Sequence, residues 1–351
     1  MEKAAYQFKL DAEPISCEKY GFGHINLTFL VKTATGRRYI LQRLSSAAFG
    51  NIPGLMANVA AVTEFLSAQA SDPRESLRLV PTLDGGTYWV DEQGESWRVY
   101  DFIEDSLCLQ APETEEDFYQ SAVAFGTFQT RMAAFPAALL CETIPNFHNT
   151  PDRYRKFHAA LEADALGRAA GVLREIEFYL AREEDGGTLQ RMRESGALPL
   201  RVTHNDTKLN NVMLDAVSRK ALCVIDLDTV MPGLAAYDFG DSIRFGAATA
   251  AEDEPQADKM GLSLRLYEIF SRGFVLACPH LTGEERESLP LGARIMTLEC
   301  GLRFLTDYLE GDRYFGISFP EHNLVRARTQ LKLVEDMERK QNEMYAIVRR
   351  A

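Results

Sequence analysis

Residues 200–215 of the sequence read LRVTHNDTKLNNVMLD, and residues 221–228 read ALCVIDLD. The first segment holds a polar loop that includes His204, Asp206, Lys208 and Asn211. A short apolar run follows the loop, and after a turn a second apolar run ends at Asp226. Two short strand-like runs joined by a turn predict a β-hairpin. This hairpin would bring Asp206, Asn211 and Asp226 together in space although the chain separates them.

These three side chains offer two carboxylates and one amide oxygen, which are hard oxygen donors. Mg²⁺ prefers such donors and usually takes one or two carboxylates from a protein, which leaves positions for substrate phosphates. A further carboxylate near the metal can orient an attacking hydroxyl and accept its proton. Phosphoryl transfer requires this combination of metal ligands and a base. The sequence therefore predicts a phosphoryl-transfer site with Mg²⁺ at the hairpin.

The loop spacing H-x-D-x-K-x-x-N, over residues 204–211, resembles the protein-kinase catalytic loop, in which the Asp is the base and the Asn holds metal. Within that fold the chain resembles the aminoglycoside phosphotransferase-like small-molecule kinases. The strings HNDTKLNN, IDLDTVMPG and FGDSIRFGA are more similar still to the N-acetylhexosamine 1-kinases. The resemblance covers nearly the whole chain, from Tyr20-Gly-Phe-Gly-His-Ile-Asn to Pro320-Glu-His-Asn-Leu-Val-Arg.

The resemblance implies an α+β, bilobal protein-kinase-like fold. Residues 1–104 would form a small antiparallel-β lobe that binds nucleotide, and residues 105–351 a larger, mostly helical lobe with the catalytic β-hairpin. It also implies that the protein uses ATP and Mg²⁺ to phosphorylate the anomeric (C1) hydroxyl of an N-acetylhexosamine, GlcNAc or GalNAc, to the sugar 1-phosphate. Asp206 would be the catalytic base, and Asn211 and Asp226 would hold the metal.

Asp238, Phe239 and Gly240 spell the metal-binding D-F-G string of protein kinases. In those kinases the metal-binding Asp ends a hairpin strand soon after the catalytic loop, and Asp226 has that position here. Asp238 instead follows a Pro-Gly turn and a further loop. We therefore predict that Asp226 holds the metal and that Asp238 is structural, with its carboxylate bonded to backbone amides of the catalytic loop.

A short glycine-containing loop near the N-terminus is expected to cover the nucleotide. Gly21 and Gly23 lie between two strand-like runs, where they would let the backbone approach phosphates. A G-x-G string alone more often marks a tight turn, but the downstream catalytic loop favours phosphate binding. Phe102 and Glu104 follow a strand-like run at the place where kinases bind adenine through the hinge backbone. Lys208 is also expected to contact the nucleotide.

Gln42 departs from the protein-kinase pattern, because it stands where those kinases carry a third-strand lysine that binds the α- and β-phosphates. Arg43 follows it, but adjacent residues of a strand face opposite ways, so only one of them can face the nucleotide. Charge-assisted hydrogen bonds are roughly twice as strong as neutral ones, so we expect another cation to compensate for Gln42. The usual Lys–Glu ion pair is not assumed, and Glu64 is not assigned as its acid.

The acceptor side is expected to hold residues from distant parts of the chain. By resemblance, His24 would contact the acceptor, Arg303 would bond sugar hydroxyls or the acetamido oxygen, and Tyr314 would supply a hydroxyl and a ring face. Asp228 lies two residues beyond Asp226, so on an extended chain it would face the same side and touch metal or sugar.

The pattern turns helical from residue 112 onward, and the last helix is expected over residues 321–349. His148 and His158 lie in this helical part, have no assigned chemistry and are expected to be structural or exposed. The acidic residues 252–258 most often indicate a solvated face. Their alternative use would be to hold a polycationic substrate.

The composition, with 46% hydrophobic and 25% charged residues among 351, is that of a soluble globular protein. The net charge of −13 argues against nucleic acid as a partner, because its phosphates require a basic surface. No apolar run is long enough to cross a membrane, and the first residues lack the core of a signal peptide. Six scattered cysteines indicate free thiols and a cytoplasmic location. We expect a monomer whose partners are MgATP and a small sugar.

Two other functions fit these residues. A kinase of the same fold for an aminoglycoside, a choline-like amine or another alcohol agrees with the net charge and with the acidic residues 252–258, since fold alone does not fix an acceptor. A nucleotide-binding pseudokinase that acts as a regulatory or interaction module is supported only by Gln42. ADP release that depends on an acceptor would eliminate the pseudokinase.

Overall fold

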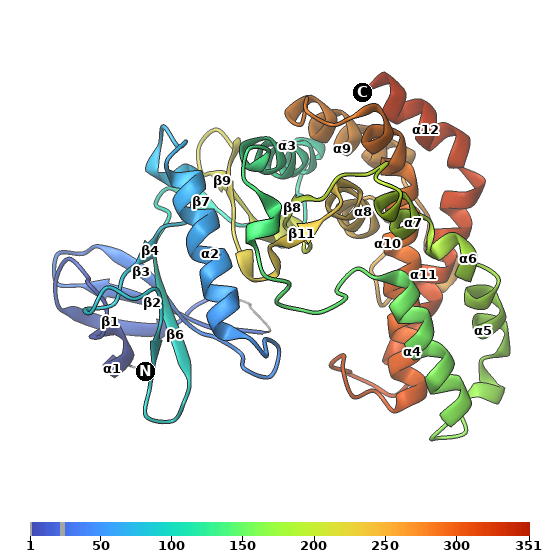
Figure 1. Cartoon of the computed structure of the whole chain (residues 1–351), viewed down its shortest axis with the longest axis horizontal. Helices are drawn as coiled ribbons and strands as arrows, with labels where there is room; N and C mark the ends of the chain where they lie inside the picture. Colours follow the sequence, from blue (N-terminus) through green and yellow to red (C-terminus); the bar gives the residue numbers. More distant parts are fainter. Residues whose placement is uncertain (1, 22–24) are drawn as a thin grey trace.

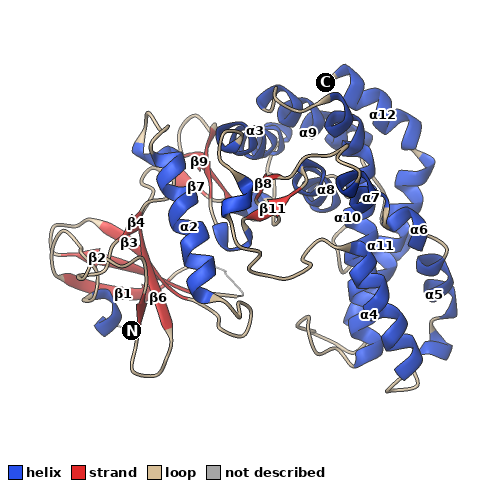
Figure 2. Cartoon of the chain, viewed as in Figure 1, coloured by secondary structure: helices blue, strands red, loops and turns tan. Residues whose placement is uncertain are grey.

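The computed structural model describes residues 2–21 and 25–351, and it has two lobes (Figure 1). The first lobe is built on an antiparallel sheet, and the second is mostly helical (Figure 2). The last long strand of the first sheet ends at Asp101, and the next strand, which begins at Ser106, belongs to the second lobe. This architecture confirms the predicted α+β, two-lobed arrangement.

The sheet of the first lobe has the strand order β1-β2-β3-β6-β4, and β5 also pairs with β6. Its strands are β1 (Pro14–Lys19), β2 (Leu27–Thr33), β3 (Arg38–Arg43), β4 (Leu79–Val80), β5 (Trp89–Val90) and β6 (Ser96–Asp101). Successive side chains of a strand face opposite sides of the sheet. One side therefore buries Phe29, Leu41 and Val99 beneath the short helix α1 (Glu2–Ala5).

Helix α2 (Ile52–Ser67) lies between this sheet and the second lobe (Figure 1). The Asn51 side chain accepts a hydrogen bond from the amide of Gly54 and so caps the start of the helix. Leu55, Val59 and Val62 have no exposed surface and lie in a core that continues into the second lobe. The helix therefore ties the two lobes together through apolar contacts.

The second lobe packs its helices around the 28-residue helix α10, which contacts α8, α11 and α4 (Figure 1). Its helices are α3 (Glu115–Met132), α4 (Thr150–Ala163), α5 (Leu173–Leu180), α6 (Glu183–Gly186), α7 (Thr188–Glu194), α8 (Ala235–Gly246), α9 (Leu264–Ala277), α10 (Gly283–Glu310), α11 (His322–Arg339) and α12 (Gln341–Arg350). Helices α8 and α10 cross closely at Gly240 and Gly292, which have no side chains. A Cβ atom on Gly240 would lie only 2.4 Å from the carbonyl oxygen of Gly292.

The single helix expected over residues 321–349 is wrong, because the chain forms two helices that meet at Lys340. The Lys340 ammonium donates to the carbonyl oxygen of Leu262, at 2.7 Å, and to the carboxylate of Asp336, at 2.8 Å. These contacts hold the junction against the segment before α9. The apolar rhythm continues through the junction, so the sequence pattern did not reveal the break.

The predicted hairpin is confirmed. It consists of β9 (Val212–Asp215) and β10 (Ala221–Val224), and β9 also pairs with β7 (Ser106–Leu107). A second pair, β8 (Arg201–Thr203) and β11 (Met231–Gly233), lies on the other side of the polar loop. The loop over residues 204–211 is thus anchored at both ends by strands, and Asp226 lies two residues after the end of β10.

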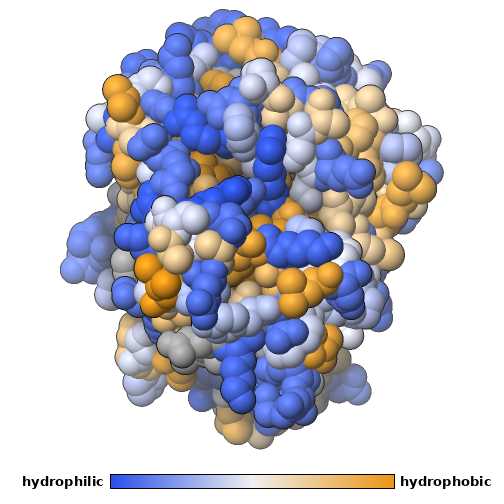
Figure 3. All heavy atoms as spheres, turned by 90° about the vertical axis from the view of Figure 1, so that its left-hand side faces the viewer, coloured by the Kyte–Doolittle hydropathy of each residue, from blue (hydrophilic) through white to orange (hydrophobic). Residues whose placement is uncertain are grey.

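Hydrophilic side chains predominate on the face shown in Figure 3, with smaller hydrophobic patches between them. Within residues 2–21 and 25–351, no helix has the length and apolar character needed to cross a membrane. Among the described residues, Cys108, Cys141, Cys223, Cys278 and Cys300 are free thiols, as the sequence predicts.

Candidate active site

The polar loop brings Asp206, Lys208 and Asn211 into direct contact. The Asn211 side-chain amide donates to the Asp206 carboxylate, at 3.0 Å, and to the Asp206 carbonyl oxygen, at 2.8 Å. The Lys208 ammonium lies 3.0 Å from the other carboxylate oxygen of Asp206. Both oxygens of Asp206 are therefore oriented by neighbours, and the carboxylate remains partly exposed to solvent.

His204 links this loop to the segment that carries Asp226. Its ring is fully buried against the edges of Phe125 and Phe128. Its Nε2 lies 2.8 Å from the carbonyl oxygen of Ile225, and its Nδ1 lies 3.3 Å from the backbone amide of Asp206. A neutral ring with its proton on Nε2 satisfies both contacts, since Nε2 then donates and Nδ1 accepts. One buried ring thus fixes the backbone of both functional segments.

Asp226 has a left-handed backbone conformation, with φ 59° and ψ 59°. Non-glycine residues rarely adopt this conformation, and when they do they cluster at functional sites. The Ile225 amide donates to the Asn211 carbonyl oxygen at 2.8 Å, so Asp226 follows directly after a backbone contact with the polar loop.

The Asp226 carboxyl group is open to solvent yet lies among other acidic groups. Desolvation by the surrounding protein, then the charges of Asp228 and Asp206, raise its pKa to about 6, and the charge of Arg98 opposes them. Negative charges near a carboxyl group disfavour its ionised form unless a nearby cation offsets them. The electrostatics of Asp226 therefore suit a cation site.

The donor set fits one Mg²⁺ ion that shares its coordination with phosphates. The Asn211 amide nitrogen is used by Asp206, whereas its Oδ1 accepts no hydrogen bond from any described residue and is available as a ligand. No cluster of three or more His, Cys, Asp or Glu side chains with metal-binding geometry occurs among the described residues. A site of one or two carboxylates plus an amide matches the way Mg²⁺ is usually held beside phosphates.

The prediction that Asp238 is structural is confirmed. Its carboxylate is fully buried at the start of α8 and accepts hydrogen bonds from the backbone amides of His204, at 3.0 Å, and Asn205, at 2.8 Å. The Gln129 side chain donates a third hydrogen bond at 2.7 Å. The Asp238 carboxylate of the literal D-F-G string thus fixes the backbone of the polar loop through these hydrogen bonds.

The geometric argument for Asp228 is wrong, because the chain after Asp226 is not extended. Residues 227–229 form a 3₁₀ turn, and the Asp228 side chain is turned inward and buried. One of its carboxylate oxygens lies 2.5 Å from Arg98 and the other accepts from Asn26 at 2.6 Å. Both oxygens are therefore occupied by the first lobe, which leaves neither turned toward a metal or a sugar.

Gln42 faces the interior and Arg43 does not. The Gln42 side-chain oxygen accepts two hydrogen bonds from the Arg98 guanidinium, at 3.0 and 2.8 Å, and its amide donates to Thr28. Arg43 instead lies 3.6 Å from Glu95 at the surface. The cation nearest to the lysine position is therefore Arg98, which the sequence reasoning did not single out.

The predicted nucleotide-binding residues are only partly described by the structure. Gly21 has φ +74° and open space around its Cα, whereas Gly23 and His24 lie outside the described residues. Phe102 lies beneath the Arg38 guanidinium, and Arg38 also pairs with Glu104. The side chains of Phe102 and Glu104 therefore both contact Arg38.

One backbone amide of the predicted hinge, between Phe102 and Glu104, is not used in a hydrogen bond within the described residues. The amide of Ile103 donates to no acceptor among residues 2–21 and 25–351, although the residue is buried. A buried, unused backbone donor is suited to a ligand such as adenine.

Arg303 and Tyr314, both predicted to contact the acceptor, lie close together. The Arg303 guanidinium lies 5.6 Å from the Tyr314 ring centre and 5.2 Å from that of Phe315. The loop that carries Tyr314 is held by Asp307, which accepts the backbone amides of residues 313, 314 and 315. Arg303 itself forms no hydrogen bond or ion pair with the described part of the chain.

His148, Glu299 and Arg153 join this region to the catalytic loop. His148 is buried, with Nδ1 3.1 Å from Glu299 and Nε2 3.4 Å from the carbonyl oxygen of Asn205. Burial opposes ionisation of Glu299, but the hydrogen bonds from His148 and Thr150 and the charge of Arg153 lower its pKa overall. Arg303 follows Glu299 by one turn of α10.

Sequence reasoning assigned no chemistry to this group. The expectation that His148 is structural or exposed agrees with a buried, hydrogen-bonded ring, and His158 is an exposed residue beside Glu183. Glu299 and Arg303 share one helical face, a spacing that could have drawn attention to Glu299. Nothing local in the sequence distinguishes Arg153.

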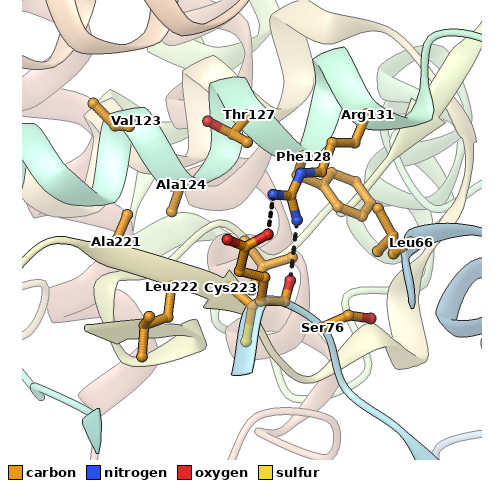
Figure 4. Close-up of a pocket in the computed structure, with 12 residues that line it drawn as sticks. Leu66, Ser76, Val123, Ala124, Thr127, Phe128, Arg131, Ala221, Leu222 and Cys223 are labelled. Carbon is orange, nitrogen blue, oxygen red and sulfur yellow. Dashed lines mark hydrogen bonds and ion pairs between the residues drawn. The ribbon is translucent and has the colours of Figure 1, made fainter. Parts of the chain in front are cut away.

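A pocket of about 120 Å³ lies elsewhere, between α3 and β10 (Figure 4). The Arg131–Glu75 ion pair crosses it, and Cys223 lies in its wall. Burial raises the pKa of the Cys223 thiol to about 12, which makes the thiol unreactive. None of the catalytic-loop residues lines this pocket, and we assign it no role in the chemistry.

The fold and the catalytic loop together define a phosphotransferase of the kinase-like class. Residues 16–268 match the family model APH, described as the phosphotransferase enzyme family, and the chain belongs to that family.

Several solved structures share the fold of the chain. The chain is similar over 98% of its length to 97% of a microcompartment-associated aminopropanol kinase, with a TM-score of 0.68 and 16% identity. All of the chain matches 97% of an aminoglycoside phosphotransferase from Alicyclobacillus acidocaldarius subsp. acidocaldarius DSM 446, with a TM-score of 0.62 and 13% identity. Amicoumacin kinase hAmiN, in complex with AMP-PNP, Ca²⁺ and Ami, is also similar, with a TM-score of 0.62 and 12% identity. The match covers 94% of this chain and 91% of the kinase. These similarities confirm the predicted kinase-like fold.

Proposed function

We propose that the protein is an ATP-dependent kinase that phosphorylates the anomeric hydroxyl of an N-acetylhexosamine, GlcNAc or GalNAc. The observation that carries the choice of acceptor is the pair Arg153 and Arg303, neither of which forms an ion pair with a described residue. Arg153 interacts with Glu299, whose partner His148 contacts the carbonyl oxygen of Asn205. The sequence resemblance to N-acetylhexosamine 1-kinases gives independent support. We further infer that it acts as a cytoplasmic monomer with MgATP as the donor.

The two arginines favour an oxygen-rich acceptor over a cationic one. Burial and then the charge of Arg303 lower the pKa of Arg153, whose Nε is buried without a partner. Neither arginine forms an ion pair within the described residues, and Glu299 is already bonded to His148 and Thr150. The charge of Glu299 offsets that of Arg153 only in part, since burial and Arg303 still lower the pKa of Arg153 overall. Two such positive charges repel an ammonium group and attract hydroxyl and acetamido oxygens. Choline and aminoglycosides are therefore disfavoured.

The acidic residues 252–258 do not offset this preference. Each of their carboxylates has a partner within the chain, in the pairs Glu252–Arg244, Asp253–His322, Glu254–Lys259 and Asp258–Lys332. A carboxylate that is already paired gains less from a cationic ligand than a free one does. The net charge of −13 is therefore no argument for a cationic acceptor.

In the proposed reaction, the Asp206 carboxylate orients the sugar O1 hydroxyl and accepts its proton. O1 forms a bond to the γ-phosphorus, the bond from that phosphorus to the β,γ-bridging oxygen breaks, and ADP leaves. Asn211 holds the Asp206 carboxylate in place through its side-chain amide. Lys208, beside Asp206, is placed to neutralise charge on the transferred phosphoryl group.

Asn211 Oδ1 and the Asp226 carboxylate are the groups that would hold Mg²⁺. When bound, the ion neutralises phosphate charge and fixes the positions of the β- and γ-phosphates. His204 keeps the Asp226 segment and the Asp206 loop at a fixed separation, because it contacts the backbone of both.

The direct test is ADP release from MgATP with a panel of GlcNAc, GalNAc, an aminoglycoside, choline and no acceptor. We expect release with the two N-acetylhexosamines and only background release otherwise. Asp206→Asn is the matched control for contaminating kinases. Release only with the amines would contradict the proposed acceptor, and no acceptor-dependent release with any compound would favour the pseudokinase.

A further inference from the structure

Arg98 lies on β6 directly opposite Gln42 of β3. Residues paired across neighbouring strands place their side chains on the same face of the sheet. The guanidinium of Arg98 reaches the Gln42 side-chain oxygen with both Nε and a terminal nitrogen, at 3.0 and 2.8 Å. A cation thus occupies the space next to the third-strand position, although it comes from the adjacent strand.

Arg98 is deeply buried and its charge is matched by Asp228. The side chains of the two residues are 1% and 2% exposed, and their charged atoms lie 2.5 Å apart. A buried charge is tolerated when it is both paired and hydrogen-bonded. Gln42 and Asp228 meet this requirement for Arg98, and Asn26 bonds the second oxygen of Asp228.

The helix that supplies the acid in protein kinases supplies none here. From α2, the sulfur of Met56 lies 3.9 Å from a terminal nitrogen of the Arg98 guanidinium. Glu64, the acidic residue of α2, is exposed and forms no ion pair with the described residues. The partner acid comes instead from the turn that follows Asp226.

The Arg98–Asp228 pair connects the first lobe to the segment that carries Asp226, the proposed metal ligand. Asp228 is two residues from Asp226, and the next residue, Thr229, donates to the His204 carbonyl oxygen at 2.7 Å. At the other end, Asn26 precedes β2 and accepts the Ser45 amide at 3.0 Å. A rigid set of contacts therefore runs from the sheet to the loop that holds Asp206.

We propose that Arg98, held by Gln42 and Asp228, is a positioning residue that replaces the missing third-strand lysine. Its charge compensates the phosphates and its ion pair holds the Asp226 segment against the first lobe. The proposal rests on the nucleotide use inferred above. It extends that function by naming the residue that assembles the nucleotide site across the two lobes.

The test separates charge from structural support by measuring MgADP binding by calorimetry and Tm by calorimetric unfolding. Arg98→Gln alone leaves Asp228 buried without its cation, so we expect a large loss of Tm. Arg98→Gln combined with Asp228→Asn removes both charges but keeps hydrogen-bonding groups, so we expect Tm to recover. MgADP affinity in this double variant should stay about tenfold or more below that of the parent, because the cation is absent.

A lysine restored by Gln42→Lys in the double variant should recover most of the affinity. Parental MgADP affinity in the double variant itself would overturn the proposal and leave the pair a purely structural bridge. If the double variant does not fold, Arg98→Lys decides: affinity within about threefold of the parent supports a role for charge, and loss beyond about tenfold at unchanged Tm overturns it. A parent that binds no MgADP would instead refute the proposed function.

Discussion

The catalytic loop and the acceptor side of the site differ in how completely their polar groups are paired. In the loop, Asp238 accepts three hydrogen bonds and the His204 ring has a partner for each nitrogen. On the proposed acceptor side, Arg303 lies over the rings of Tyr314 and Phe315 without an ion pair among the described residues, and Arg153 has a buried Nε without a partner. The loop proposed for the chemistry is therefore fully hydrogen-bonded, whereas the groups proposed for recognition keep unused hydrogen-bond donors.

This difference indicates at which residues a substitution can change function without loss of the fold. Substitutions in the loop remove several contacts at once, and their effects extend to both functional segments. Substitutions at Arg303 remove no hydrogen bond of the described protein, so they should change binding more than stability.

Asp206→Asn should lower kcat by ~10²–10⁴, because the amide cannot accept the acceptor's proton. The contacts from Asn211 and Lys208 identify Asp206 as the oriented group of the loop. MgADP affinity, measured by calorimetry, should change little. Near-parental kcat would remove Asp206 from the role of base.

Asp238→Ala should destabilise the protein by at least about 3 kcal/mol, since three buried donors would lose their acceptor at about 1–3 kcal/mol each. Urea unfolding monitored by circular dichroism measures this change. Asp238→Asn is the matched control and should cost less, because its oxygen still accepts. Retained stability together with lost Mg²⁺ binding would show instead that Asp238 is a metal ligand.

These two aspartates show what the sequence could reveal. The spacing of residues 204–211 and the position of Asp226 after a strand are local patterns, and they predicted the hairpin and the structural role of Asp238. Arg98 was missed because its partners Gln42 and Asp228 lie far away in the sequence, which leaves no local signal. Arg153 was missed because nothing in the sequence around it distinguishes it from a surface arginine. The predicted orientation of the Asp228 side chain was wrong. Residues two apart face the same side only on an extended strand, whereas residues 227–229 form a 3₁₀ turn.

Arg303→Leu should raise KM for an N-acetylhexosamine by about tenfold to a hundredfold, as expected when a charged hydrogen-bond donor is lost. Tm should stay near that of the parent. Arg349→Leu, at an exposed arginine paired with Glu287, is the matched control and should leave KM unchanged. Equal KM values for Arg303→Leu and the parent would exclude Arg303 from acceptor binding.

Mg²⁺ binding should weaken at acidic pH, because the pKa of Asp226 is raised to about 6 in the metal-free protein. The sign follows from linkage: a carboxyl with a raised pKa loses folding stability as pH rises through that pKa, and a bound cation restores it. The Tm increase caused by MgADP should therefore be larger at about pH 7.5 than at about pH 5. The extra increase should disappear in Asp226→Asn, and persistence there would assign it to another group.

Asp258→Asn should have the smallest effect. Asp258 is 92% exposed and paired with Lys332, and such surface pairs contribute roughly 0–1 kcal/mol. We expect the KM for every acceptor in the panel to stay within about twofold of the parent value. A marked rise in KM for amine acceptors alone would revive the cationic-substrate hypothesis.

The account's central claim is that Asp206, Asn211 and Asp226 form one centre that transfers phosphate to an anomeric hydroxyl. Proton-coupled phosphorus NMR of a reaction with MgATP and GlcNAc or GalNAc tests it most directly. The account predicts a new phosphate doublet, split by the single anomeric proton, equal in amount to the ADP formed and absent with Asp206→Asn. A phosphate signal split by two protons, or inorganic phosphate as the sole product, would contradict it.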